Sequence, residues 1–419
     1  MGSRSRVASP AYKWWVLGIL WTICTLNYAD RQAVSSVLPV LRARFGFSPE
    51  ALGLIGSAFA WIYAAGSPLA GFLGDRCRRK RIIVWACVIW SVATALTATC
   101  RTLDSFVGVR ALTGLGEMFY FPAAIGLLGA YHGPATRSKA FSLHQSGVYA
   151  GSILGMWGAG WWAQHRDWRG CFLVLGAAGI AAACLAGGGI AGAEPAPAAP
   201  ARSTFWQDVA AAGRALASER AIALQMAAFF LINAVAVALL VWLPTFFYDR
   251  FHASLLAAAL YSGLLLNLPS LLSVHAGGWL ADALAARIGV GRLIVQVAGL
   301  LAGAVCLVRM GTATDTVTVM AAVGLFGLCK GLYDANIFAS LFDVADRSQH
   351  SVMTGLMNTV GWLGGALGPL ALSLMMVHGR HGADTAANMS EGIAALALLY
   401  LLGAGILIAA GRCYPERVR

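Results

Sequence analysis

Hydrophobic residues fall in twelve long runs along this chain, separated by short polar stretches. A helix needs about 20 residues to cross a bilayer, and in lipid it satisfies its own backbone polar groups, so runs of this length predict transmembrane helices. The pattern therefore predicts an all-α membrane protein with twelve transmembrane helices in two six-helix bundles. The runs are 14–41, 51–73, 82–100, 106–131, 140–163 and 170–192, then 221–247, 254–281, 292–310, 317–342, 351–377 and 391–411.

A proline-rich polar stretch separates the two sets of runs. It reads Glu194-Pro-Ala-Pro-Ala-Ala-Pro-Ala-Arg-Ser-Thr, a composition typical of a linker. The mixed polarity from Phe205 to Arg220 is typical of a helix on the membrane surface. We predict an N-terminal bundle over residues 1–192, a linker over 193–220 and a C-terminal bundle over 221–419.

Composition supports the membrane assignment. The 419 residues are 59% hydrophobic and only 11% charged, whereas a soluble protein carries about 25% charged residues. The net charge of +12 would suggest a nucleic-acid partner in a soluble chain, but here it is better explained by loop charge. With both termini on one side, that side holds 19 of the 30 Lys and Arg residues and the opposite loops hold 8. The positive-inside rule therefore predicts cytoplasmic termini and a cytoplasmic linker.

The N-terminus and the cysteines narrow the class further. The first apolar run is too long for a signal peptide and has charges in its interior, so we expect a retained first span. An Ala- and Gly-rich composition favours a bacterial inner membrane. The 9 cysteines are scattered and form no Cys-x-x-Cys spacing, so neither a metal site nor a disulfide framework is indicated and no cofactor is expected.

Short motifs recur between the two halves at nearly constant spacing, which predicts duplicated bundles with a site between them, as in many transporters. The pairs are Gly71…Asp75 with Gly278…Asp282, 207 residues apart; Gly114…Glu117 with Gly331…Asp334, 217 apart; and Gly151…Gly155 with Gly364…Gly368, 213 apart.

Six ionisable residues lie inside the predicted spans, where a charge is costly and usually lines a cavity or pathway. Arg110 and Glu117 are seven residues apart, nearly two helical turns, so they share one face about 10 Å apart along the axis. A structural Arg–Glu pair that locks helices together is the alternative to a transport role. The six are Asp30, Arg31, Arg110, Glu117, Lys330 and Asp334.

The sequence separates these charges into two groups. Asp30 and Arg31 are neighbours about 100° apart on a helix, so we expect each to find a partner on another helix, for example Asp30 with Arg110. Lys330 and Asp334 are spaced i,i+4, which favours an ion pair within one helix. The alternative is that they add polarity to the site. For His144, a satisfied core histidine is favoured over a ligand.

The loop Gly71-Phe-Leu-Gly-Asp75-Arg76-Cys-Arg-Arg79-Lys80-Arg81 resembles the signature of the major facilitator superfamily. The resemblance implies a transporter that works by alternating access and is functional as a monomer. It also implies that this loop and its second copy control the conformational change. The residues concerned are Gly71, Asp75, Arg76, Arg79, Gly278 and Asp282.

Within that superfamily, the first span, Leu26-Asn27-Tyr28-Ala29-Asp30-Arg31, is similar to the anion:cation symporter branch, which includes galactonate, hexuronate and sialic-acid carriers. Trp242-Leu-Pro-Thr-Phe and Asn358-Thr-x-Gly-x-x-Gly-Gly agree with that branch. The resemblance implies Arg residues for the substrate carboxylate and acidic residues for the proton. The expected substrate-binding residues are Arg31, Tyr63, Arg110, Gln145 and Asn358; the expected proton-coupling residues are Asp30 and Glu117.

These residues suggest proton-coupled symport, the uptake of a small organic anion such as a sugar acid or carboxylate. Arg is suited to bidentate capture of a carboxylate, and burial makes it easier for a carboxylate to take up a proton. The first half also resembles the Spinster family, so a proton-coupled lysolipid or amphiphile transporter is the alternative. An enzyme is not expected, because the spans contain neither His-x-x-Glu-His nor Gly-x-Gly-Asp.

Overall fold

The computed structural model describes residues 11–190, 219–345 and 350–414, together with positions 207, 210, 213 and 216; the side chains at 74–76, 134–135, 138 and 350–352 are left out. Its described elements are helices. Those of the first half are α2 (Tyr12–Phe45), α3 (Pro49–Arg76), α4 (Arg79–Thr97), α5 (Leu103–Glu117), α6 (Tyr120–Tyr131), α7 (Pro134–His165) and α8 (Arg169–Gly189).

The second half repeats this order. Its helices are α10 (Arg220–Phe251), α11 (Leu255–Ala285), α12 (Gly291–Thr312), α13 (Thr316–Asp334), α14 (Ile337–Val344), α15 (His350–His378) and α16 (Thr385–Arg412).

Each predicted apolar run corresponds to a helix or to a broken pair of helices, so the predicted fold class is confirmed. Ten spans among the described residues are long and apolar enough to cross a membrane, with α5–α6 and α13–α14 each counted as one. The other two predicted spans are α2 and α7. Helix α2 has polar residues in its middle, including Asp30 and Arg31, and α7 is also rich in polar residues. The predicted linker at 193–220 lies almost wholly outside the described residues.

Two spans break directly after an acidic residue. Helix α5 ends at Glu117 and α6 begins at Tyr120, with Pro122 in its first turn. Proline lacks an N–H and clashes with the carbonyl four residues earlier, here that of Met118, so the helix cannot continue through this point. In the second half α13 ends at Asp334. There Asn336 donates a side-chain hydrogen bond to the Leu332 carbonyl (3.0 Å), a local bond that competes with regular helix.

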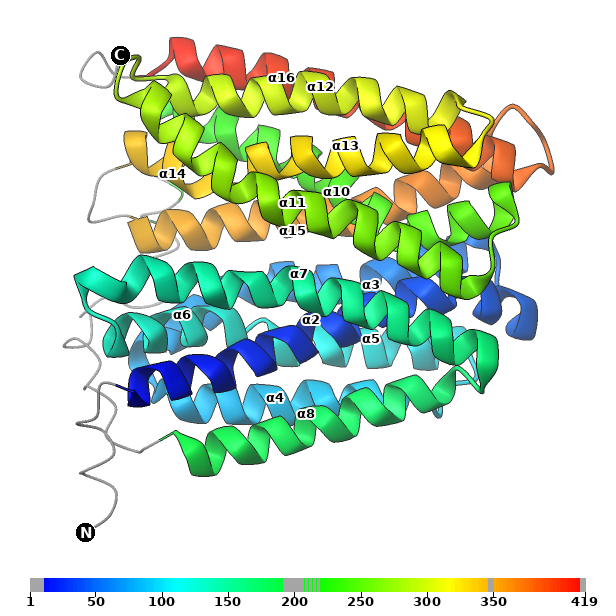
Figure 1. Ribbon diagram of the computed structural model, residues 1–419, viewed down its shortest axis with the longest axis horizontal. Coiled ribbons are helices and arrows are strands. Elements are labelled where there is room, and N and C mark those ends of the chain that lie inside the picture. Colours follow the sequence, from blue (N-terminus) through cyan, green and yellow to red (C-terminus); the bar gives the residue numbers. More distant parts are fainter. Residues whose placement is uncertain are drawn as a thin grey trace.

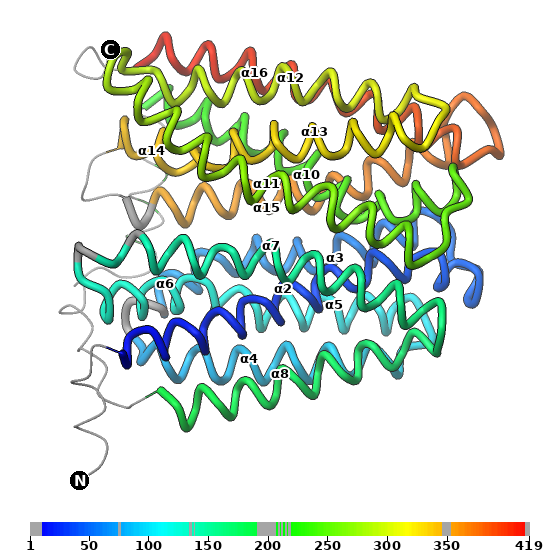
Figure 2. Tube along the Cα trace, viewed as in Figure 1, coloured from blue at the N-terminus to red at the C-terminus, as the bar shows by residue number. Residues whose placement is uncertain are grey.

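The helices form two bundles that lie one above the other (Figure 1). In the first, α2 packs on α7 and α8, and α4 packs on α5 and α8; in the second, α10 packs on α15 and α16, and α12 on α13 and α16. The bundles meet through α3 with α15, α7 with α11, and α2 with α10. Tracing the chain in Figure 2 shows that α2 begins and α16 ends at the same end of the molecule, which we call the terminal end.

The repeated glycines explain the tightest packing within each bundle. A Cβ at Gly151 or Gly155 of α7 would overlap backbone carbonyls of α2 at Thr25 and Ala29. In the second half, a Cβ at Gly364 or Gly368 of α15 would overlap carbonyls of α10 at Phe230 and Ala234. The duplicated motif therefore marks the same helix crossing in both bundles, where only glycine lets the backbones approach this closely.

Gly155→Ala is expected to lower the apparent melting temperature of the purified protein by several degrees. The added methyl group would force α7 away from the Ala29 carbonyl, and overpacking of this kind costs about 1–3 kcal/mol. Gly158→Ala on the same helix is the matched control, because a Cβ there meets nothing within 4 Å. Equal melting temperatures for the two variants would contradict this account of the crossing.

The bundles touch closely at the end opposite the terminal end. Arg42 near the end of α2 donates to both carboxylate oxygens of Asp249 near the end of α10, with one distance of 2.7 Å. The Gln164 side chain of α7 accepts a hydrogen bond from the Leu256 backbone N–H of α11 (2.9 Å). A Cβ at Gly53 of α3 would lie 2.6 Å from the Ser373 hydroxyl of α15. These contacts close the interface at this end.

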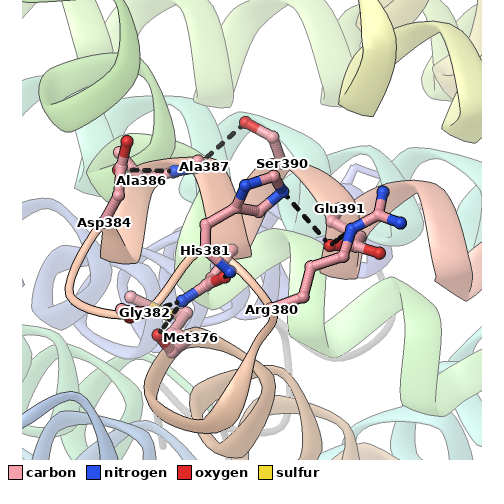
Figure 3. Close-up of polar contacts among 10 residues, drawn as sticks. Met376, Arg380, His381, Gly382, Asp384, Ala386, Ala387, Ser390 and Glu391 are labelled. Carbon is pink, nitrogen blue, oxygen red and sulfur yellow. Dashed lines mark hydrogen bonds and ion pairs between the residues drawn. The ribbon is translucent and has the colours of Figure 1, made fainter.

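The turn between α15 and α16 lies at the same opposite end and is fixed by polar contacts (Figure 3). The Asp384 carboxylate accepts a hydrogen bond from the Ala387 N–H (2.9 Å) and so caps α16. The Glu391 carboxylate forms an ion pair with Arg380, with Nε at 2.8 Å, and lies 3.3 Å from His381 Nε2. The turn therefore orients the start of α16.

Candidate functional site

Four of the predicted intramembrane charges gather in the middle of the first bundle. Asp30 and Arg31 are on α2, and Arg110 and Glu117 are on α5. All four side chains are buried. Two positive and two negative groups therefore share one protein interior.

Arg31 and Glu117 form an ion pair that joins α2 to α5. Arg31 donates from Nε to Glu117 Oε2 at 2.9 Å and from Nη2 to the same oxygen. The same Nη2 also donates to Asn27 Oδ1 at 3.3 Å. The other carboxylate oxygen of Glu117 is buried without a hydrogen-bond partner among the described residues.

The expected pairing of Asp30 with Arg110 is wrong. Asp30 instead accepts a hydrogen bond from the Thr94 hydroxyl of α4 at 2.9 Å, and no ion pair joins Asp30 and Arg110 within 4.0 Å. The reason lies in the helical rotation between neighbours. Because Asp30 and Arg31 point about 100° apart, Arg31 reaches α5 while Asp30 faces α4.

Arg110 has no hydrogen-bond or ion-pair partner among the described residues, and its Nε is buried without one. Its guanidinium lies 5.4 Å from the centre of the Phe59 ring, a cation–π contact. Only 5% of the residue is exposed. Glu117 and Asp30 interact with Arg110 electrostatically, but neither makes a direct contact with its guanidinium. Its N–H donors are therefore available to an anion.

A central cavity of about 40 Å³ lies between the bundles. Its polar lining comes from the first bundle: Arg31, Gln32, Ser35 and Arg110. This volume holds only a few water molecules and is far smaller than the roughly 300–1,000 Å³ of a typical ligand pocket. The bundles must therefore separate further before a substrate can occupy the cavity. Its apolar lining residues are Val34, Leu38, Gly56, Phe59, Ala60, Val237, Leu240, Val241 and Trp362.

Four aromatic rings surround the Arg31 guanidinium. The ring centres of Tyr28 and Phe59 lie 4.4 Å from Arg31 Cζ, that of Trp362 at 5.2 Å and that of Tyr63 at 5.5 Å. Tyr63 also packs on Trp362 at 4.8 Å. Trp362 belongs to α15, so this aromatic cage links the charged cluster of the first bundle to the second bundle.

The family assignment rests on the sequence profile of the Major Facilitator Superfamily, which matches residues 20–369. The chain belongs to the major facilitator superfamily. It is 26% identical to the chloroplastic sodium-dependent phosphate transport protein 1 of Arabidopsis thaliana, over 93% of this chain and 77% of that protein.

Two further relatives match this chain over a shorter length. The chain is 29% identical to a probable galactarate/D-glucarate transporter of Escherichia coli over 43% of this chain and 42% of that one. It is 30% identical to the protein spinster of Drosophila melanogaster over 56% of this chain and 39% of that one. A crystal structure of a bacterial homologue of the human lysosomal transporter Spinster, inward-facing and occupied, superposes with a TM-score of 0.79 at 19% identity, covering 98% and 99% of the two chains.

The loop residues expected to control the conformational change of this superfamily are only partly described. The side chains of Asp75 and Arg76 lie outside the described residues. A Cβ at Gly71 or Gly278 would meet nothing within 4 Å, so neither glycine makes a close helix contact in this conformation. Both lie in the halves of α3 and α11 nearer the terminal end, away from the contacts that close the opposite end.

The second copy of this loop forms an ion-pair network. Arg292 pairs with Asp282 at 2.7 Å and with Asp343 at 2.5 Å. The 217-residue spacing makes Gly126 the counterpart of Asp343, and a Cβ at Gly126 would lie 2.6 Å from Arg79 Nε. The first-half arginine therefore lies over a glycine where the second half has a carboxylate.

Gln145 and Asn358 do not border the central cavity in this conformation. Both are half-buried, and Asn358 is one turn from Trp362 on α15, toward the terminal end. Their assigned roles remain predictions. His144 is a buried core residue that is only half satisfied. Its Nε2 contacts the Tyr120 hydroxyl at 2.9 Å, and that hydroxyl donates to the Leu20 carbonyl at 2.6 Å, whereas its Nδ1 is buried without a hydrogen-bond partner among the described residues.

Sequence reasoning missed several contributors to the site. Thr94 donates a hydrogen bond to Asp30. Phe59 and Trp362 belong both to the aromatic cage and to the cavity lining. A signal was present for Phe59, because it is one helical turn from Tyr63, which was selected. Trp362 lies within the eleventh-span motif, where the glycines drew attention to packing instead.

Proposed function

We propose that this protein takes up a small organic anion together with protons. Arg110 carries this proposal, because it is a buried guanidinium beside the central cavity with no hydrogen-bond or ion-pair partner among the described residues. The substrates in the names of three relatives agree in charge: phosphate, galactarate/D-glucarate and, for a Cupriavidus necator relative, sulfoacetate. Each of these substrates is an anion. An anion would supply the hydrogen bonds and negative charge that Arg110 lacks.

The coupling follows from the second arginine. Glu117 is the one ion-pair partner of Arg31 among the described residues, so a proton on Glu117 weakens that pair and releases guanidinium donors toward the substrate. Asp30 is the other acceptor, since its carboxyl interacts electrostatically with Glu117. Proton and anion then bind together, because each removes the electrostatic cost of the other.

Movement of the bundles completes the cycle. The contacts at the opposite end, led by Arg42 with Asp249, hold that end closed. Binding at the central cavity favours the rearrangement that opens one end and closes the other, as the superfamily's alternating access requires. The excess of Lys and Arg at the terminal end orients that end toward the cytoplasm of a bacterial inner membrane. A single chain contains the whole cavity and suffices for this cycle.

A Spinster-like lysolipid or amphiphile transporter is the second candidate. The similarity to the Drosophila protein spinster favours it, as does the largely apolar lining of the cavity. Arg110 would bind an anionic group in either case, so it does not separate the two candidates. The size of the cavity, about 40 Å³, favours the small anion, because a small anion needs less expansion of the cavity.

The test is uptake by the purified protein in liposomes. A panel of labelled sugar acids, small carboxylates and one lysolipid is offered with an inward proton gradient, and again after a protonophore collapses it. We expect accumulation of a carboxylate that disappears with the gradient. Gradient-sensitive movement of the lysolipid without carboxylate uptake would establish the second candidate in its place.

A further inference from the structure

A second intramembrane ion pair lies where the internal repeat places the counterpart of Glu117. Asp334 is the last residue of α13, as Glu117 is the last residue of α5, and each span breaks directly afterwards. Glu117 receives its cation from another helix, whereas Asp334 receives it from Lys330 on its own helix. The two ion pairs therefore occupy corresponding positions in the two bundles.

Lys330 and Asp334 lie on the protein-facing side of α13. The exposed apolar side chains of this helix, Val317, Leu325 and Leu328, share one face. At 100° per residue, Lys330 lies about 180° from the centre of that face. Asp334 also interacts electrostatically with Tyr149, which lies on α7 of the other bundle. The pair thus faces the first bundle rather than the lipid.

The second ion pair is more accessible than the first. The side chains of Lys330 and Asp334 are 17% and 25% exposed, against 7% and 0% for Arg31 and Glu117. A charge exposed to lipid within a span is costly, so this exposed surface fits a water-filled passage better than contact with lipid. Lys330 has three N–H donors, and Asp334 is its one hydrogen-bond partner among the described residues. Donors therefore remain for a solute in the passage.

We propose that Lys330 binds the second carboxylate of the substrate, so that the transporter selects dianions over monoanions. This inference rests on the proposed anion uptake. Arg110, with Arg31, receives one carboxylate from the first bundle, and Lys330 receives the other from the second. Asp334 positions the Lys330 ammonium and weakens its electrostatic attraction for the substrate. The substrate can therefore be released. Closure of the bundles brings the two cationic positions toward the two ends of one molecule.

The experiment compares two six-carbon acids that differ by one charge. Uptake of labelled D-glucarate, a diacid, and D-gluconate, its monoacid counterpart, is measured in liposomes for the wild type, Lys330→Gln and Asp334→Asn. The wild type is expected to prefer D-glucarate. Lys330→Gln should lower the glucarate-to-gluconate ratio of kcat/KM by about tenfold, the equivalent of about 1.4 kcal/mol, because uptake of the diacid falls more than uptake of the monoacid. Asp334→Asn should raise the ratio, because it frees the ammonium.

Opposite effects of the two variants separate substrate binding from a purely structural ion pair. If both variants lower the uptake of the two acids alike and lower the melting temperature alike, the pair only supports the helix and the inference is wrong. A wild type with no preference, or a ratio unchanged in Lys330→Gln, overturns it while anion uptake stands. A wild type that transports neither acid, nor any carboxylate of the panel, overturns the proposed function itself.

Discussion

Uptake by the Arg110→Gln variant is expected to fall at least about 30-fold in kcat/KM. Arg110 lies beside the central cavity without a partner among the described residues, so its donors are available to a substrate carboxylate. Losing one partner of a buried charged contact costs about 2–5 kcal/mol, and each 1.4 kcal/mol is tenfold. The whole effect should be on transport.

Stability should respond in the opposite sense. A buried charge without a partner destabilises the fold, so its removal is expected to leave the melting temperature unchanged or raise it. Arg31→Gln is the informative contrast. It leaves Glu117 buried without its cation, a change that costs about 3–5 kcal/mol, and should lower the melting temperature as well as uptake.

The measurement is gradient-driven uptake in liposomes beside thermal unfolding of the same preparation. Arg101→Gln is the matched control, because it removes the same charge from an exposed position in the α4–α5 loop of the same bundle. Normal uptake by Arg110→Gln would rule out Arg110 as the anion-binding group. A melting temperature that falls together with uptake would indicate a structural role instead.

The span pattern was predictable because membrane helices are specified locally. Each run satisfies its own backbone in lipid, so length and hydropathy suffice to place a helix such as α10 without knowledge of its neighbours. The break after Glu117 was also encoded locally, in Pro122. It was missed because a continuous apolar run from 106 to 131 hides a change in helix direction.

The partners of the buried charges were not predictable in the same way. Spacing along one helix gives the angle between the Asp30 and Arg31 side chains, but it does not show which neighbouring helix each side chain contacts. That depends on the rotation of α2 against α4 and α5, which close contacts such as Gly155 on Ala29 help to set. The sequence therefore located the buried charges but did not predict the ion pair of Arg31 with Glu117. Lys330 and Asp334 were paired correctly, since both lie on one helix.

The conformation sets a further limit on sequence reasoning. Gly71 and Gly278 were selected as residues that control the conformational change, yet a Cβ at either position would meet nothing within 4 Å in this conformation. The sequence of a transporter must be compatible with all of its conformations, whereas a structure describes one conformation. The contacts of Arg42 with Asp249 and Gly53 with Ser373 belong to the state with the opposite end closed.

The Asp30→Asn variant is expected to lose gradient-driven accumulation while it retains exchange. Asparagine has nearly the same shape and can still accept the hydrogen bond from Thr94, but it cannot take up a proton. It also leaves the ion pair of Arg31 with Glu117 in place. Substrate binding should therefore survive. Glu117→Gln would be less informative, because it removes that ion pair as well.

The size of the loss follows from the driving force. One pH unit is worth 1.36 kcal/mol per proton, so a gradient of about two units supports roughly 100-fold accumulation if one proton accompanies each anion. Asp30→Asn should accumulate the labelled anion only to about the external concentration, while it exchanges internal for external anion at a measurable rate. Asp104→Asn is the matched control, since this carboxylate is exposed at the start of α5. Normal accumulation by Asp30→Asn would assign the proton to Glu117 alone, and loss of exchange together with accumulation would make Asp30 part of the anion site.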